Sequence, residues 1–525
     1  MAGGPDFNAF LIIMAVVVTV AVFLVNVYVL VNYQHPDDKN QAYLPKFVVV
    51  LGLSVAQISI LMLPLDVANR KACENAIVTG ACNLTLPMEQ LWSAIYIINV
   101  VLVFFVIPFS MFFYEADMDD SPGKRAWSAL QWCLVTAVVV ILVLGIMYGV
   151  VGYVDLPVRR LDARVVPFSS AARARFDVLG PSTPCLLSDN TAAVSGPAAS
   201  ECYGYGGSAG SEDTWSLRSS FPVYVIALST IVGSVLFAIF GGVGIISLPL
   251  DCIFSFFRRP KALITRSQYI QKATELGRRA REIRDTAQAL QKEERAGSKG
   301  RKWKKNVRLL QHELVYLEQE EMDLAEVYPQ GEEAEAMWAL TVVGYLCQLL
   351  FGLVGLVFSA LWIGHIIVYS LMKPPASVLL NDMFVKLDNA FGLFGTAAFA
   401  LFCFYLLLAV VAGEMKLGLT FVLFTVHPMR WGRTLMSSFL FNVGLILLCS
   451  ISVIQFCATA FALYAQETAV ANIFGHQLEN LRGIKVLFRY GIFQIVFVSL
   501  AFLTFVYYIG FGWRRRPRTR ISLTG

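Results

Sequence analysis

The stretch Phe10–Val31, FLIIMAVVVTVAVFLVNVYVLV, decides the fold class because it runs through 22 residues without a charged side chain. A helix needs about 20 mostly apolar residues to cross a hydrocarbon core of roughly 30 Å. Backbone polar groups cannot face lipid unpaired, so such a segment is expected to cross as a closed α-helix. The stretch has no basic leader and exceeds the roughly 7–15 apolar residues of a signal peptide, which predicts an uncleaved first span.

Eight more apolar blocks follow, and the composition is 57% hydrophobic and only 15% charged, against about 25% charged in soluble domains. The chain lacks the roughly ten-residue alternating segments of a membrane barrel. We therefore predict an all-α polytopic membrane protein with about nine transmembrane helices. The blocks after the first are Phe47–Leu65, Leu91–Tyr114, Trp127–Gly149, Phe221–Leu248, Trp338–Leu371, Phe391–Gly413, Leu435–Tyr464 and Phe488–Gly512.

Lysine and arginine indicate which side of the membrane each loop occupies. With nine spans and the N-terminus outside, the dense basic run at 258–308 and the arginine-rich tail fall inside. Cytosolic loops carry an excess of these residues, so this orientation is favoured. It divides the chain into a five-span region at 1–250, with outer loops at 66–90 and 153–220, a cytosolic loop at 251–337, a four-span region at 338–512 and a basic cytosolic tail at 513–525.

The cytosolic loop shows helical periodicity on both sides of a glycine-containing break at 296–300. This predicts an αα-hairpin between spans five and six. A basic amphipathic segment can bind anionic lipid or a partner helix, and its apolar stripe can support a homodimer. The simpler interpretation, which we favour, is a solvated hairpin whose charges pair internally. The apolar positions are Leu276, Ala280, Ile283, Ala287 and Leu290, then Trp303, Val307, Leu310, Leu314, Leu317 and Leu324.

The outer loops carry two signs of an oxidising compartment. Asn83 begins the only N-x-S/T sequon of the chain, which makes it a glycosylation candidate. Four cysteines, Cys73, Cys82, Cys185 and Cys202, are disulfide candidates there. The local pairings are Cys73–Cys82 and Cys185–Cys202, and all three connectivities remain open. No cysteine or histidine spacing suggests zinc or another metal.

Ionisable side chains inside spans are expensive and are therefore functional candidates. Asp66, Glu115 and Glu414 lie at expected span ends, where water or headgroups would solvate them. His365 lies well inside span six, where a histidine is more often a hydrogen-bonded interior residue than a ligand. Neutral Asn99 and Asn442 are expected to join helices, although a transporter would use them with His365 in a polar midplane cavity.

Three prolines, Pro64, Pro108 and Pro249, lie near span ends, where they can open the helix and expose carbonyls or simply end it. The run Phe240–Gly244 supplies small residues for close helix packing. No nucleophile elbow, zincin motif or dinucleotide fingerprint is present, so neither catalysis nor a cofactor is expected. The basic run has one interleaved aromatic, Trp303, which argues against nucleic-acid binding.

Several short stretches form a recognisable set that is spread over nearly the whole chain. They are Val31–Asp38, Leu61–Arg70, Val106–Phe109, Ser247–Leu250, Arg258–Ala262 and Phe439–Ala460. In these stretches the chain resembles the LIMR-type family, which takes its name from the lipocalin-interacting membrane receptor and includes the limb-region protein. The resemblance is greatest to the plant and protist branch, and 182–211 has no counterpart in it. The resemblance implies nine spans, an outer N-terminus and a long cytosolic loop, with no agreed catalytic residues.

The patterns around Asp66 and from Pro108 to Glu115 are also similar to the lysosomal cobalamin transport escort protein. This resemblance implies a receptor or escort protein that supports vesicular trafficking, endocytosis or small-molecule export through a partner transporter or receptor. It implies a plasma membrane or an endolysosomal or vacuolar membrane. The alternative is a transporter with its own substrate path through the spans.

Overall fold

The structure is a computed structural model in which nine helices among the described residues are long and apolar enough to cross a membrane. The predicted number of spans is confirmed for this part of the chain. The structure describes residues 9–35, 38–39, 43–71, 86–116, 121–158, 213–219, 221–259, 266–295, part of 303–324, 334–372, 375–391, 393–417, 429, 432, 434–466, 468–472, 481–482 and 485–511. The spans are Ala9–Tyr33, Tyr43–Arg70, Met88–Glu115, Pro122–Val151, Tyr224–Arg258, Trp338–Leu371, Phe394–Leu417, Met436–Ala460 and Ile492–Phe511.

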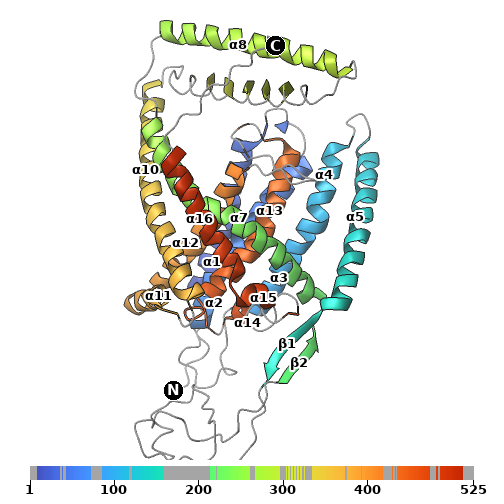
Figure 1. The fold of residues 1–525 in the computed structure, drawn as a ribbon, viewed down its shortest axis with the longest axis vertical. Coiled ribbons are helices and arrows are strands. Elements are labelled where there is room, and N and C mark those ends of the chain that lie inside the picture. The colour runs from blue at the N-terminus through green and yellow to red at the C-terminus, as the bar shows by residue number, and fades with distance from the viewer. Residues whose placement is uncertain are drawn as a thin grey trace, which may run out of the picture. The chain divides into compact units, whose positions relative to one another are not determined.

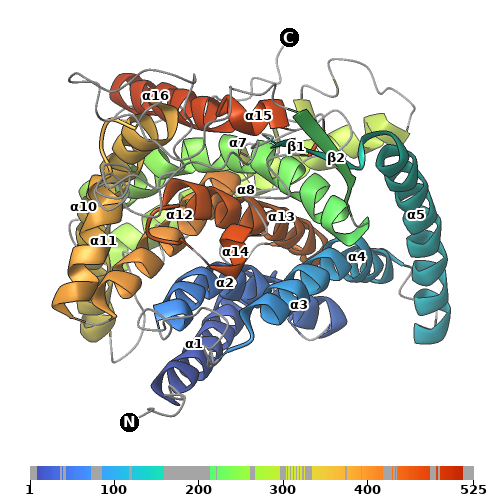
Figure 2. The same cartoon turned by 90° about the horizontal axis from the view of Figure 1, so that it is seen from below.

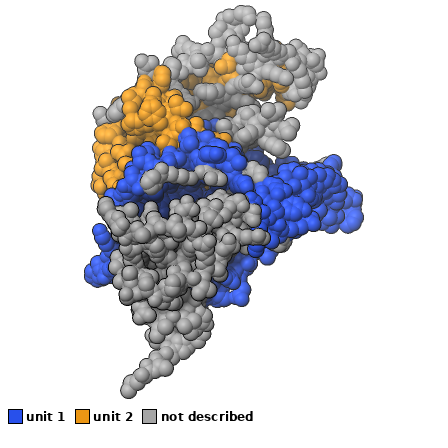
Figure 3. Space-filling model, turned by 60° about the horizontal axis from the view of Figure 1, so that its bottom comes forward, with its two compact units in different colours: residues 1–238, 365–407, 417–496 blue, residues 239–364, 408–416, 497–525 orange. Residues whose placement is uncertain are grey.

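The chain forms two compact units (Figure 3). Unit 1 contains residues 1–238, 365–407 and 417–496, and unit 2 contains residues 239–364, 408–416 and 497–525. Several spans contribute one end to each unit, so the units do not coincide with the membrane regions expected from the loops.

Unit 1 is built around α13 (Met436–Ala460), which packs against α2 (Tyr43–Lys71) and α4 (Ile107–Glu115) (Figures 1 and 2). Most side chains of α13 are buried, as expected for a span that is apolar all round. Gly52 lets α2 approach closely, because a Cβ there would overlap the side chain of Val443. The other helices with residues in this unit are α1 (Ala9–Tyr33), α3 (Met88–Val101), α5 (Pro122–Val151), α7 (Phe221–Arg258), α11 (Leu379–Ala390), α12 (Phe394–Leu417), α14 (Ala469–Asn472) and α15 (Lys485–Arg489), together with the last residue of α10 (Ala334–His365) and the first turn of α16 (Ile492–Phe511).

Two spans contain π-helical segments, η3 (Leu102–Val106) and η4 (Ile366–Leu371). Pro108 follows η3 in the first turn of α4, and a residue without an N–H favours such a local opening of the helix. Pro64 and Pro249 instead lie inside continuous helices, α2 and α7. The alternative that these two prolines end their helices is therefore wrong.

A short antiparallel sheet, which the all-α prediction did not include, lies within the expected outer loop at 153–220. Strand β1 (Tyr153–Val158) pairs with β2 (Asp213–Arg218), so that Tyr153 lies opposite Arg218. On its other side β1 makes an isolated antiparallel bridge from Val154 to Leu481. We call β1, β2 and residues 481–482 the outer stem.

Several helix boundaries differ from the apolar blocks, among them those of α2, α13 and the ninth block. Helix α2 continues to Lys71 instead of ending at Leu65. Helix α13 ends at Ala460, and turns replace the expected final residues up to Tyr464. The ninth block is divided into α15 and α16 (Ile492–Phe511) at Gly491, whose φ of 61° lies in the left-handed region.

Unit 2 contains α8 (Arg266–Arg295), most of α10 (Ala334–His365), residues 408–416 of α12 and the remainders of α7 and α16. The glycine run of α7 packs closely, as predicted. A Cβ at Gly242 would lie 2.8 Å from the carbonyl oxygen of Phe497. One at Gly244 would overlap the carbonyl oxygen of Ala409, and one at Gly413 would overlap that of Phe240. The backbones of α7 and α12 are therefore in direct contact.

Candidate functional site

Polar contacts in unit 1 gather on residues 460–466 and 468–470, which we call the α13–α14 connection. At its far end, Asp66 Oδ2 accepts hydrogen bonds from Trp92 Nε1 at 2.9 Å and from the backbone N–H of Val470 at 3.2 Å. Asp66 is only 3% exposed. The expectation that water or headgroups solvate Asp66 is wrong, because α2 continues beyond it and α3 and α14 cover it.

The residues after Asp66 attach α2 to two more segments. The side-chain amide of Asn69 donates to Leu86 O at 3.0 Å and accepts from Leu86 N at 3.1 Å. Arg70 donates to the carbonyl oxygen of Gln466 in the α13–α14 connection. The stretch from Asp66 to Arg70 thus joins the start of α3 and the α13–α14 connection to the end of α2.

His365 binds the near end of the α13–α14 connection. Its Nε2 lies 2.8 Å from the carbonyl oxygen of Ala460, and the ring stacks between Tyr369 and Phe461, with centroids 5.0 and 4.7 Å away. The residue is buried. These contacts match the expected hydrogen-bonded interior histidine.

Asp388 and Tyr464 form a second polar pair on the same connection. Tyr464 donates its hydroxyl to Asp388 Oδ2 at 2.6 Å, and its backbone N–H donates to Asn381 Oδ1 at 3.1 Å. The backbone N–H of Thr396 donates to Asp388 Oδ1 at 3.0 Å. Burial, and then the hydrogen bond to Asp388, raise the pKa of Tyr464 well above its usual range. Sequence reasoning missed Asp388 because it lies on the amphipathic helix α11, outside the expected spans.

The structure therefore brings Asp66 and His365 onto one connection but does not group His365 with Asn99 and Asn442. Asn99 Nδ2 donates to the carbonyl oxygen of Leu447 at 3.3 Å, within α13. Ala460 follows Leu447 by 13 residues in the same helix, which corresponds to roughly 20 Å along the helix axis. Asn442 lies still further from Ala460 and is buried. The midplane cluster of these three residues that a transporter would use is not formed.

Asp38, in one of the stretches that carry the family resemblance, joins three segments of unit 1. Its Oδ1 accepts from the hydroxyl of Tyr114 at 2.9 Å, and its Oδ2 accepts from the backbone N–H of Met436 at 3.2 Å. The carboxyl group thus lies at the first turn of α13, where a free N–H and the helix dipole favour it. Glu115, next to Tyr114, is exposed, as expected for a solvated span end.

The outer stem is held by a buried carboxyl group. Arg482 donates to both oxygens of Asp155, at 3.1 and 3.0 Å, and Ser216 donates to Oδ1 at 2.8 Å. Lys485 Nζ lies 3.7 Å from Oδ2. The hydrogen bond from Arg482 lowers the pKa of Asp155, and Ser216 and Lys485 act in the same direction against the effect of burial.

Two large apolar side chains of the outer stem are exposed. Trp215 is 60% exposed and Leu217 is 53% exposed, and both belong to β2, an edge strand of the described sheet. The end of β2 is fixed to α5, since Tyr148 donates to the carbonyl oxygen of Ser219 at 2.6 Å and lies under the guanidinium of Arg218. The stem is thus an anchored support with an apolar exposed side.

In unit 2, Glu414 is 1% exposed, and neither of its carboxyl oxygens has a hydrogen-bond partner among the described residues. The expectation of a solvated span end is wrong here too, because α7 covers this part of α12. Nearby on α12, Lys416 Nζ lies 2.5 Å from Asp251 Oδ2, and Tyr508 donates to Asp251 Oδ1 at 2.6 Å.

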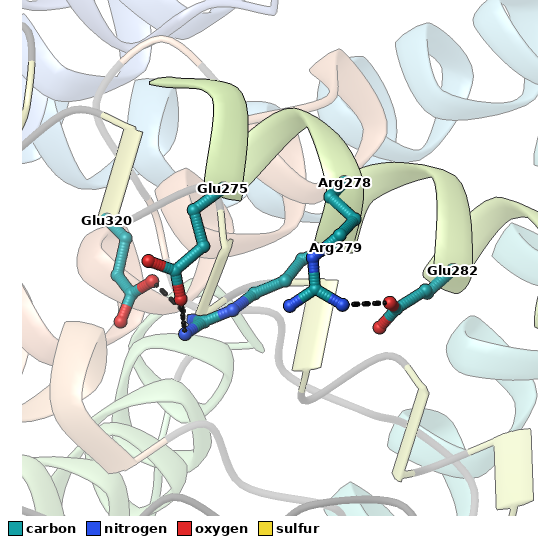
Figure 4. A network of polar contacts seen from close by, with 5 residues as sticks. All are labelled: Glu275, Arg278, Arg279, Glu282 and Glu320. Carbon is teal, nitrogen blue, oxygen red and sulfur yellow. Dashed lines mark hydrogen bonds and ion pairs between the residues drawn. The ribbon is translucent and has the colours of Figure 1, made fainter. Parts of the chain in front are cut away.

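The charges of α8 pair with one another and with the segment 303–324. Figure 4 shows Arg279 between Glu275 and Glu320, at 2.7 and 2.9 Å. Arg278 binds Glu282 at 2.6 Å. Trp303 Nε1 donates to the carbonyl oxygen of Leu290, so Trp303 lies near the end of α8. Glu320 lies near the middle of α8, because it binds Arg279. These contacts join α8 to the described part of 303–324 by internal charge pairing.

Five predicted modification residues, Asn83, Cys73, Cys82, Cys185 and Cys202, lie outside the described residues. Their glycosylation and disulfide pairing stay predictions.

Comparison with known proteins gives the chain a family. The profile described as LMBR1-like membrane protein matches residues 11–312 and 261–506. The chain is 60% identical to a LIMR family protein of Arabidopsis thaliana and 61% identical to one of Oryza sativa subsp. japonica, each over 520 residues and 99% of both chains. A LIMR family protein of Dictyostelium discoideum is 33% identical over 511 residues, 94% of this chain and 97% of that one. No solved structure matches significantly. The predicted resemblance is confirmed, and the chain belongs to the LIMR family of LMBR1-like membrane proteins.

Proposed function

We propose that this protein is a multispan receptor or escort protein that supports vesicular trafficking, endocytosis or small-molecule export through a partner transporter or receptor. One observation carries the proposal. The outer stem holds an exposed pair of apolar side chains, Trp215 and Leu217, on a support anchored by Asp155, Arg482 and Tyr148. Exposed aromatic and aliphatic side chains on a rigid support are typical anchors of protein interfaces.

The polar groups inside unit 1 support a structural role for the spans. Asn26 donates to Ser54 at 3.0 Å, Asn99 donates to a carbonyl of α13, and His365 is bound to Ala460 O. Such contacts join helices in the absence of a hydrophobic driving force between them. Recognition on the outer side, without catalysis by the protein itself, is consistent with this use of the polar residues. We place the protein in the plasma membrane or in an endolysosomal or vacuolar membrane.

The proposal is tested by site-specific photocrosslinking in cells. A photoreactive amino acid is placed at 215 or 217 of the full-length protein, and at Val139 of α5 as a control with similar exposure. We expect a membrane transporter or receptor to be crosslinked from 215 and 217 but not from 139. The substitutions Trp215→Thr and Leu217→Thr, which preserve strand propensity, should then reduce the amount of that partner in its target membrane. Identical products from all three positions, or normal partner levels in the double variant, would contradict the proposal.

A further inference from the structure

Glu414 is an ionisable residue that has no counter-charge among the residues that the structure describes. It lies within the seventh span, Phe394–Leu417, and its side chain is almost completely buried. Neither Oε1 nor Oε2 has a hydrogen-bond partner among the described residues. Asp66, the other buried carboxyl group expected at a span end, is bound by Trp92 and Val470. Glu414 therefore differs from Asp66, whose carboxyl group joins helices through hydrogen bonds.

Close backbone contact between α7 and α12 keeps water from this part of the span. Gly413, the residue before Glu414, lies against the carbonyl oxygen of Phe240, and a Cβ there would overlap that oxygen. Four residues earlier in α12, the carbonyl oxygen of Ala409 lies against Gly244 in the same way. Two glycines on opposing helices thus bring the backbones together beside the carboxyl group.

The charged groups near Glu414 are engaged by other groups. Among the described residues, the titratable side chains of the elements packed here include Asp251, Cys252 and Arg258 of α7, Lys416 of α12, and Tyr507 and Tyr508 of α16. Lys416 binds Asp251 at 2.5 Å and also contacts the hydroxyl of Tyr508, which donates to Asp251. Lys416 follows Glu414 by two residues, and side chains two apart on a helix point to different sides. Arg258, a second cation, lies over the ring of Phe254. Lys416 is therefore committed to Asp251.

An ionised carboxyl group in an apolar site without a partner is so unfavourable that it takes up a proton instead. We propose that Glu414 is a proton-binding site within the membrane, which holds one proton while α7 and α12 are packed together and releases it to water when they separate. On binding, an O–H bond forms on a carboxylate oxygen. On release, the proton passes to water and Glu414 becomes a carboxylate. The ligand is the proton itself. Its binding is coupled to the contact that Gly244 and Gly413 make with the opposing backbone.

The first test is infrared spectroscopy of the full-length protein in lipid nanodiscs at neutral pH. Wild type is compared with Glu414→Gln, which imitates the neutral side chain, and with Glu115→Gln, which removes an exposed carboxyl group. We expect the carbonyl absorption of a protonated carboxyl group in wild type and in Glu115→Gln, and its loss in Glu414→Gln. Carboxyl-¹³C glutamate in the wild type should shift this band, which assigns it to glutamate and excludes the buried aspartate Asp66 without a variant. Wild type without such a band would overturn the proposal.

The second test is the pH dependence of Tm from about pH 5 to about pH 9. The folded state binds the proton and the unfolded state releases it, so the stability linked to Glu414 is present at low pH and lost as pH rises. Tm of wild type and of Glu115→Gln should fall more steeply with pH than Tm of Glu414→Gln. Glu414→Asp, which retains a carboxyl group, should keep the steeper slope. Equal slopes in wild type and Glu414→Gln would contradict a proton bound at this position.

Discussion

Trp92 donates its indole N–H to Oδ2 of Asp66 across 2.9 Å, and the same oxygen accepts the backbone N–H of Val470. One carboxyl oxygen therefore binds α3 and α14 to α2. Both side chains are buried, and the ring of Trp92 stacks on Tyr96 with centroids 5.7 Å apart. Because the contacts come from segments far apart in the chain, this pair should stabilise the tertiary arrangement of unit 1.

Trp92→Phe should destabilise the protein by about 1–3 kcal/mol, because it leaves a buried acceptor with one donor fewer. Trp132→Phe on α5 is the matched control, since Trp132 is 59% exposed and its loss should be nearly neutral. The measurement is denaturant unfolding of both variants in the same detergent. A cost for Trp92→Phe no greater than that for Trp132→Phe would show that the hydrogen bond is dispensable.

The sequence predicted the spans well because their number depends on local composition. Apolar blocks of about 20 residues are visible without knowledge of their neighbours. The close packing of Gly244 was also predictable, since only small residues permit backbone contact. The burial of Asp66 and Glu414 was not, because it depends on which helices cover a span end. Trp92 and Val470, which bind Asp66, follow it by 26 and 404 residues.

The outer stem was missed for a related reason. Its strands are separated by the long segment 159–212, and its third segment is at 481–482, so no hairpin turn signal links them. The pairing of Asp155 with Arg482 spans 327 residues. Such long-range contacts leave no periodic pattern in a single sequence.

The ion pair between Arg279 and Glu320 should form again when the two residues are exchanged. Arg279→Glu alone places three acidic groups together, at 275, 279 and 320, and should lower stability by roughly 0.5–1 kcal/mol. Adding Glu320→Arg should recover part of the loss, measured as Tm of the full-length protein at low salt. Reversal of the exposed pair Arg278–Glu282 is the control and should change little. No recovery in the double variant would contradict side-by-side packing of α8 and 303–324.

The outer stem should resist acid down to about pH 4. The folded-state pKa of Asp155 is lowered by Arg482, so its stabilisation is present above the unfolded pKa of about 3.9 and lost only as pH falls through the lower folded value. Arg482→Gln should reduce hydrogen-exchange protection of the β1 amides by a constant factor between about pH 7 and about pH 5. The two proteins should converge below about pH 4. Convergence already between pH 7 and pH 5 would mean that another group holds the stem.

Gly413→Ala should destabilise unit 2, because the new Cβ would overlap the carbonyl oxygen of Phe240. Overpacking of this kind costs about 1–3 kcal/mol, against a gain of up to about 1 kcal/mol from the higher helix propensity of alanine. Gly145→Ala on α5 is the matched control, since a Cβ there meets nothing within 4 Å and only the gain applies. Tm of the two variants should therefore move in opposite directions. Because the backbone contact also shields Glu414, Gly413→Ala should in addition weaken the carbonyl band of the protonated carboxyl group at neutral pH, whereas Gly145→Ala should leave it unchanged.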